Sequence, residues 1–128
     1  MKSKVMRRAG LVTAAFANSC LVAGCGKPLC NNEVIRGIPS PDGADIAFVF
    51  RRNCDATPGW TTHVSVMDIH RPLRDERGNV LIVGGTQSLK VSWLGPRRLL
   101  VTSFKEPVNR KVPQINMVTV EFRSTADK

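Results

Sequence analysis

The chain has 128 residues, of which 42% are hydrophobic and 23% charged, a composition typical of one globular domain rather than of a disordered or fibrous protein. The formal net charge of +9 is uneven, because four of the 19 basic residues lie within the first eight positions. Without those four the basic excess falls to +5, and the remaining bases are scattered among few aromatic residues. Such a pattern is a poor match for a nucleic-acid-binding surface, and no nucleic-acid partner is predicted.

An uncharged stretch follows these basic residues and ends at a cysteine. Residues 9–24 carry no charge, but they are short for a membrane-spanning helix, which needs roughly 20 apolar residues. A basic start, a short apolar stretch and small residues at its end are typical of a secretory signal peptide. The stretch ends in Val22-Ala23-Gly24-Cys25, which resembles the lipobox of bacterial lipoproteins.

This resemblance implies that residues 1–24 are removed as a lipoprotein signal peptide and that Cys25 receives a diacylglyceryl group and begins an acylated mature chain. The partner of that anchor is a membrane of the bacterial cell envelope. Gly26, rather than Asp, implies the periplasmic side of the outer membrane in a host with two membranes. Cys20 is a rival cleavage point with a poorer match before it. A plain secretory signal and an uncleaved anchor remain alternatives.

Two thiols, Cys30 and Cys54, remain in the mature chain once Cys20 is removed and Cys25 is lipidated. In an oxidising compartment they are expected to form a disulfide. On the chain-entropy model, the loop that it closes would raise the free energy of unfolding by roughly 3–4 kcal/mol. Unpaired cysteines, or a catalytic Cys54 with His63 as its base, are the alternatives. The cysteines and histidines show no metal-ligand spacing, so neither a metal nor another cofactor is predicted.

The mature chain is expected to be all-β. A tether over residues 25–36 precedes a β domain over residues 37–128, which opens on the turn Ser40-Pro41-Asp42-Gly43. Alternating apolar residues or turn signals then predict six strands, at 45–52, 62–69, 80–83, 89–93, 98–104 and 114–123. Residues 46–50 are apolar on both faces, which indicates a central strand, and residues 70–79 read as a solvated loop.

The fold class is therefore a single small antiparallel meander or sandwich. The turn at residues 40–43 and the segment 91–101 resemble strand pairs of β-propeller blades, although a propeller needs at least about four blades and the chain is too short. Residues 40–95 also resemble small bacterial β-domain proteins with an SPDG turn and a Cys-Gly-Ala-Thr-Thr-Gly-Phe-like loop. The chain departs from that loop at Asp55, Pro58 and Trp60. The resemblance implies a fold and no activity.

One group of residues is a candidate ligand surface, namely Arg51, Arg52, Trp60 and His63. A guanidinium binds carboxylate or phosphate while an aromatic ring stacks on a sugar or base, so the group predicts an anionic or sugar ligand. The alternative is that the arginines are a solvated strand end, that Trp60 caps the core and that His63 is a half-exposed strand residue.

These observations favour a non-enzymatic, membrane-anchored envelope protein that binds or scaffolds an unidentified ligand. Its expected partners are the membrane, an envelope protein or an anionic surface. One alternative is an inhibitor or chaperone-like partner of a periplasmic enzyme. Another is a cysteine- or histidine-dependent enzyme, but no catalytic residues are predicted, because the sequence holds no catalytic motif.

Overall fold

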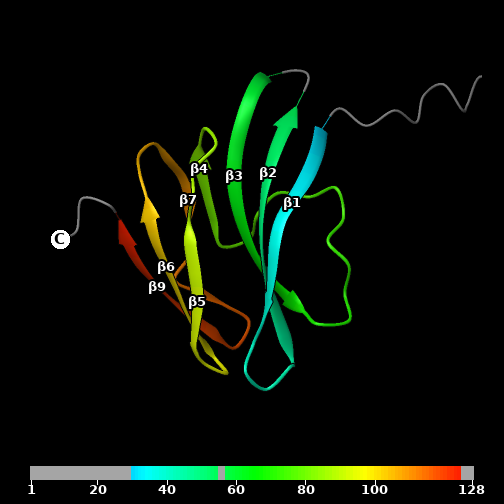
Figure 1. The fold of residues 1–128 in the computed structure, drawn as a ribbon, viewed down its shortest axis with the longest axis vertical. Helices are drawn as coiled ribbons and strands as arrows, with labels where there is room; N and C mark the ends of the chain where they lie inside the picture. Colours follow the sequence, from blue (N-terminus) through cyan, green and yellow to red (C-terminus); the bar gives the residue numbers. More distant parts are fainter. Residues whose placement is uncertain (1–29, 55–56, 125–128) are drawn as a thin grey trace, which may run out of the picture.

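The computed structural model describes residues 30–54 and 57–124, which form nine strands and no helix (Figure 1). The strands are β1 (Cys30–Pro39), β2 (Asp45–Cys54), β3 (Thr57–Asp68), β4 (Leu81–Gly84), β5 (Lys90–Gly95), β6 (Arg98–Phe104), β7 (Val108–Lys111), β8 (Gln114–Ile115) and β9 (Val118–Ser124). They form a five-stranded sheet in the order β1-β2-β3-β4-β7 and a four-stranded sheet in the order β5-β6-β9-β8. The predicted all-β class is confirmed.

Neighbouring strands run antiparallel, except that β6 and β9 are parallel. The two sheets share one hydrophobic core, so the domain is a small sandwich. Alternate residues of β2, β3, β4, β6 and β9 enter this core, as the period of two in the sequence predicts. Its members include Val49, Val64, Val66, Leu81 and Val83 from the first sheet and Val91, Leu99, Val101, Val118 and Val120 from the second.

The outer face of the five-stranded sheet is also covered. Phe50, Met67 and Ile82 lie on that face and are 0–3% exposed. Residues 69–80, which we name the covering loop, pass over them, and the Asn79 side chain binds both the N–H and the C=O of Val66. The predicted loop over residues 70–79 is confirmed and most of its residues are exposed, but part of its backbone is bonded to the sheet rather than to solvent.

Strand β1 occupies part of the predicted tether. It pairs with β2 from Cys30 opposite Cys54 to Pro39 opposite Ile46, with an irregularity at Ile35. The tether prediction is therefore wrong for residues 30–36, while residues 25–29 and the predicted signal peptide 1–24 lie outside the described residues. This strand was not predicted because its sequence begins with the polar residues Asn31, Asn32 and Glu33. An edge strand tolerates polar side chains without alternation.

Two hydrogen bonds join β1 to β5 and to the residue just before it, across the sandwich. The Arg36 guanidinium donates to the Leu89 carbonyl at 3.0 Å, and Trp93 Nε1 donates to the Ile38 carbonyl at 2.8 Å. The two strands belong to different sheets and lie side by side at the front of the molecule in Figure 1. These bonds close the sandwich along that side.

Candidate functional site

The four predicted ligand-surface residues lie on two opposite faces of the five-stranded sheet. Successive residues of a strand point to opposite faces, so Arg51 and Arg52 diverge. Arg51 and Trp60 share the face that carries the core, whereas Arg52 and His63 share the outer face beneath the covering loop. The four residues therefore do not form the single ligand surface that the sequence predicts.

Arg51 and Trp60 form a compact group with Glu33 at the end of the sheet. The Arg51 guanidinium carbon lies 4.3 Å from the centre of the Trp60 ring. Its Nε and Nη2 donate to Glu33 Oε1 at 2.9 and 2.7 Å. The Arg51 and Glu33 side chains are 35% and 45% exposed, so the pair lies at the surface and contributes at most about 1 kcal/mol. A carboxylate thus already neutralises the Arg51 guanidinium, so Arg51 is a weaker candidate for binding an anionic ligand.

Arg52 has a structural role. Its side chain is only 11% exposed, and Nη1 donates to Asn32 Oδ1, Asp75 Oδ1 and the Glu76 carbonyl at 2.8–3.2 Å. Asn32 Nδ2 in turn donates to the carbonyls of Arg74 and Glu76. Arg52 and Asn32 therefore hold the covering loop against β1 and β2, and neither alternation nor spacing in the sequence pointed to Asn32.

His63 is buried rather than half-exposed, with 2% of its surface accessible. The ring stacks on Phe50 with centroids 5.1 Å apart, and Nδ1 accepts the Gly78 N–H at 2.9 Å. A backbone N–H can only donate, so the ring proton lies on Nε2, which donates to Thr61 Oγ1 at 2.7 Å. Burial, together with the positive charges of Arg52, Arg77 and Arg110, lowers the pKa of His63 to about 4.

Gly78 allows the close approach on which this histidine depends. A Cβ at position 78 would lie 2.9 Å from both the His63 Cβ and the Val64 carbonyl oxygen. Both neighbours belong to a central strand and have no room to move. Glycine is therefore required for the covering loop to reach His63.

The two mature cysteines come together as predicted. Cys30 and Cys54 are directly opposite in the β1–β2 register, with sulfur atoms 2.07 Å apart and Cα atoms 3.9 Å apart. The predicted pair is confirmed at disulfide distance. A catalytic thiol at Cys54 with His63 as its base is not supported by this geometry, because the sulfur is bonded and the ring is enclosed.

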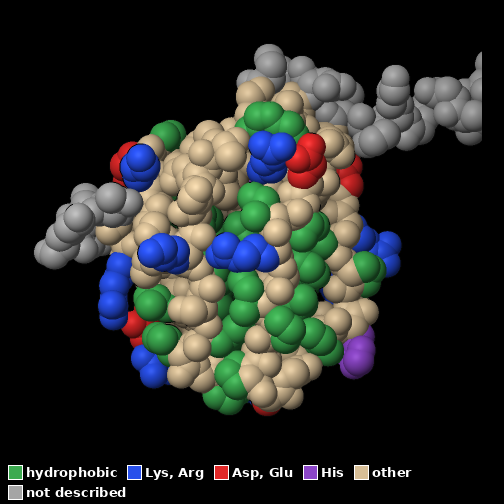
Figure 2. Space-filling view, viewed as in Figure 1, with side chains coloured by type: hydrophobic (Ala, Val, Ile, Leu, Met, Phe, Trp, Pro, Cys, Tyr) green, Lys and Arg blue, Asp and Glu red, His purple; other side chains and the backbone are tan. Residues whose placement is uncertain are grey.

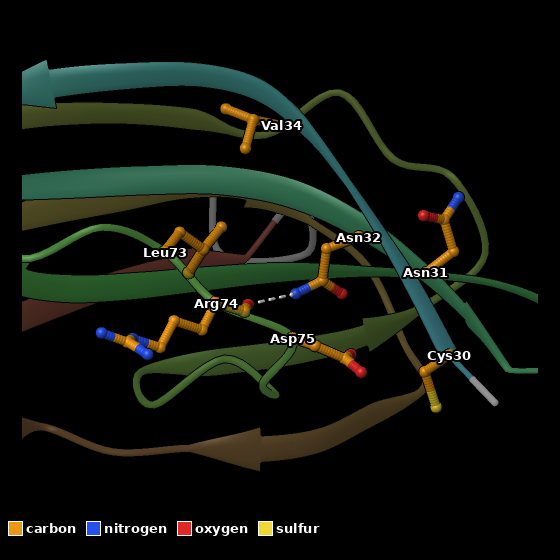
Figure 3. Close-up of a pocket in the computed structure, with 7 residues that line it drawn as sticks. All are labelled: Cys30, Asn31, Asn32, Val34, Leu73, Arg74 and Asp75. Atoms are coloured by element: carbon orange, nitrogen blue, oxygen red, sulfur yellow. Dashed lines mark hydrogen bonds between the residues drawn. The ribbon is translucent and has the colours of Figure 1, made fainter. Parts of the chain in front are cut away.

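An open pocket of about 300 Å³ lies beside the start of β1 (Figure 3). Two segments line this pocket. The residues from β1 are Cys30, Asn31, Asn32 and Val34, and those from the covering loop are Leu73, Arg74 and Asp75. Figure 3 shows the Asn32 amide directed at the Arg74 carbonyl while the Arg74 side chain extends away from it. Amide, carboxylate and guanidinium groups surrounding two apolar side chains suit a small amphipathic ligand or a peptide side chain.

The exposed surface offers little else that is concentrated. Figure 2 shows hydrophobic side chains over the region between β5 and β1, with basic side chains scattered around them. Val34 and Ile35 are 53% and 47% exposed. Within the described ranges no group of three or more histidine, cysteine or acidic side chains could hold a metal ion. No helix long and apolar enough to cross a membrane occurs in the same ranges.

Comparison with known proteins adds no assignment to this site. No family model matches the chain, and neither does any curated protein or solved structure.

Proposed function

We propose that the chain is a lipid-anchored protein of the bacterial cell envelope whose sandwich domain is a non-enzymatic binding module. The observation that carries this proposal is the Cys30–Cys54 pair at disulfide distance. Disulfides persist in exported proteins and are rare in the cytosol, so the pair agrees with a signal peptide ending at the lipobox. Only four residues separate the proposed lipid attachment at Cys25 from the first strand.

Binding is favoured over catalysis by what the reactive residues do. Cys54 is paired, His63 is enclosed between Phe50 and the covering loop, and Arg52 is engaged in holding that loop. The pocket beside β1 offers polar and apolar groups to a ligand, and among its described lining residues no nucleophile lies beside a base.

The anchor is tested by expressing the full chain and comparing wild type with Cys25→Ser. We expect the wild-type protein to begin at residue 25, to carry acyl chains by intact-mass analysis and to sediment with membranes. Cys25→Ser should remain an unprocessed precursor or become soluble. Cys20→Ser is the matched control and should behave as wild type. An unmodified Cys25, or cleavage elsewhere, would refute the anchor.

The binding module is tested by placing a photo-crosslinking amino acid at position 34, where the exposed Val34 lines the pocket. The matched control places it at exposed Thr119, which lies on β9 of the other sheet. We expect discrete adducts from position 34 and none from position 119. A single enzyme captured in a one-to-one complex would favour an inhibitor role, and identical or absent adducts at both positions would count against a binding site at this pocket.

A further inference from the structure

We propose that the end of the sandwich where β1 begins and β2 ends lies against the bilayer, with Trp60 in the headgroup region. This inference rests on the proposed lipidation of Cys25. It adds an orientation of the domain and names the side chain that contacts lipid.

The length of chain between the anchor and the domain limits the orientations that the domain can take. Five Cα-to-Cα steps lead from Cys25 to Cys30, and each spans at most about 3.6 Å, so Cys30 lies within about 18 Å of the lipidated residue. Cys30 is joined to Cys54 at the last residue of β2. The ends of β1 and β2 must therefore both remain close to the membrane surface.

The opposite end of the domain cannot be the end that faces the membrane, because Cys30 would then lie about 30 Å from the surface, farther than the linker of about 18 Å allows. Strand β1 has ten residues, which at about 3.3 Å each separate its two ends by about 30 Å. The turn after Pro39 lies at the distal end. Trp93 lies there too, because its side chain binds Ile38 next to that turn. Figure 1 shows the start of β1 and the end of β2 together at the top and the β1–β2 turn at the bottom.

Trp60 is the side chain at the proximal end that suits the bilayer interface. It pairs with Asn53, one residue before Cys54, and it is only half-buried. In the described part of the chain its indole N–H has no hydrogen-bond acceptor, whereas the N–H of Trp93 donates to the Ile38 carbonyl. An indole with an apolar ring and a free N–H is the group enriched at the headgroup level of membranes.

The charges around Trp60 indicate which lipid surface is needed. Arg51 lies over its ring, but the guanidinium is neutralised by Glu33. The group has no net charge, so insertion of the indole, rather than attraction to anionic lipid, is the source of the contact. Zwitterionic phospholipid should therefore be sufficient.

The two tryptophans provide the test, because they are the only two in the chain and lie at opposite ends of β1. The lipidated full-length protein is incorporated into phosphatidylcholine vesicles that contain brominated acyl chains, which quench nearby indole fluorescence. Trp93→Phe leaves Trp60 as the reporter, and Trp60→Phe leaves Trp93. We expect quenching of Trp60 to exceed that of Trp93 by at least about twofold.

A second measurement removes the dependence on folding of the variants. Wild-type protein labelled with 5-fluorotryptophan gives two fluorine resonances, and a paramagnetic headgroup lipid should broaden the Trp60 resonance selectively. Equal or reversed effects in protein that floats with the vesicles would overturn the orientation and leave the anchor intact. Absence of acyl mass on Cys25 would overturn both the anchor and the orientation. A contact that appears only with anionic vesicles would refute insertion as its source.

Discussion

Acidification should destabilise the domain through one residue, His63. The neutral ring accepts the Gly78 N–H, so protonation at Nδ1 removes that bond and sets two donors against each other. The added charge would also face Arg52 on β2, Arg77 on the covering loop and Arg110 on β7. Within residues 30–54 and 57–124, no carboxylate is among the charges that influence this ring. His63 therefore stays neutral in the folded state over a pH range in which the same side chain is protonated in the unfolded chain.

The magnitude follows from the difference between the two pKa values. The pKa of His63 is 6.5 ordinarily and about 4 in the fold. Each unit corresponds to 1.36 kcal/mol, so the free energy of unfolding falls by about 3 kcal/mol once the pH is below 4, and by about 2 kcal/mol at pH 5. The stability is fully present above the unfolded pKa and is lost as the pH falls from 6.5 towards 4.

Urea unfolding at pH 7 and pH 5 measures this loss. We expect wild type to lose about 2 kcal/mol between the two pH values, and His63→Gln to lose distinctly less, whatever its stability at pH 7. His70→Gln is the control, since His70 is exposed and should leave the wild-type pH dependence unchanged. Equal losses in wild type and His63→Gln would refute the reasoning, because shared carboxylates would then account for the whole effect.

Three further predictions concern the contacts that hold β1 and the covering loop. Cys54→Ala should lower the free energy of unfolding by roughly 2–4 kcal/mol in urea without changing lipidation, and a stability that is the same with and without reductant would contradict the pairing. Asn32→Ala should lower the free energy of unfolding by about 1–3 kcal/mol and speed amide hydrogen exchange in residues 71–79, because it removes the donor to the Arg74 and Glu76 carbonyls. Unchanged exchange would show that these bonds do not hold the loop. Trp93→Phe should lower the free energy of unfolding by about 1 kcal/mol in thermal or urea unfolding, because the bond to Ile38 is lost. An unchanged stability would mean that this bond does not hold β1 to β5.

The sequence was informative where strands alternate and are bounded by turns. Residues 45–52 were expected to be a central strand because both faces are apolar, and β2 indeed has the core on one face and the covering loop on the other. The expected strand 114–123 is divided into β8 and β9 at Asn116, whose φ of 55° requires the left-handed conformation that Asn tolerates. The parallel pairing of β6 with β9 has no local signature, because it joins residues about 20 positions apart.

The candidate site was harder to predict, for two different reasons. The separation of Arg51 from Arg52 was available from the sequence, because adjacent residues of any strand face opposite sides. The burial of His63 was not, because it depends on the covering loop, whose charged sequence resembles an ordinary solvated connection. That loop is bonded to the sheet through main-chain atoms and through Asn32 and Asn79, and such contacts leave no periodic pattern.

The position of the disulfide bears on how an edge strand would carry the proposed membrane anchor. Strand β1 has a neighbour on one side only, so a pull at its first residue would unzip its hydrogen bonds from β2 one at a time. Cys30 is that first residue, and its bond to Cys54 transfers the load to β2, which is paired on both sides. Asn32, two residues further along β1, is then kept in place to hold the covering loop, and that loop in turn keeps His63 neutral and buried. With the proposed anchor at Cys25, the disulfide is thus placed where motion of the anchor relative to the domain would otherwise begin to open the pocket and uncover the outer face of the sheet.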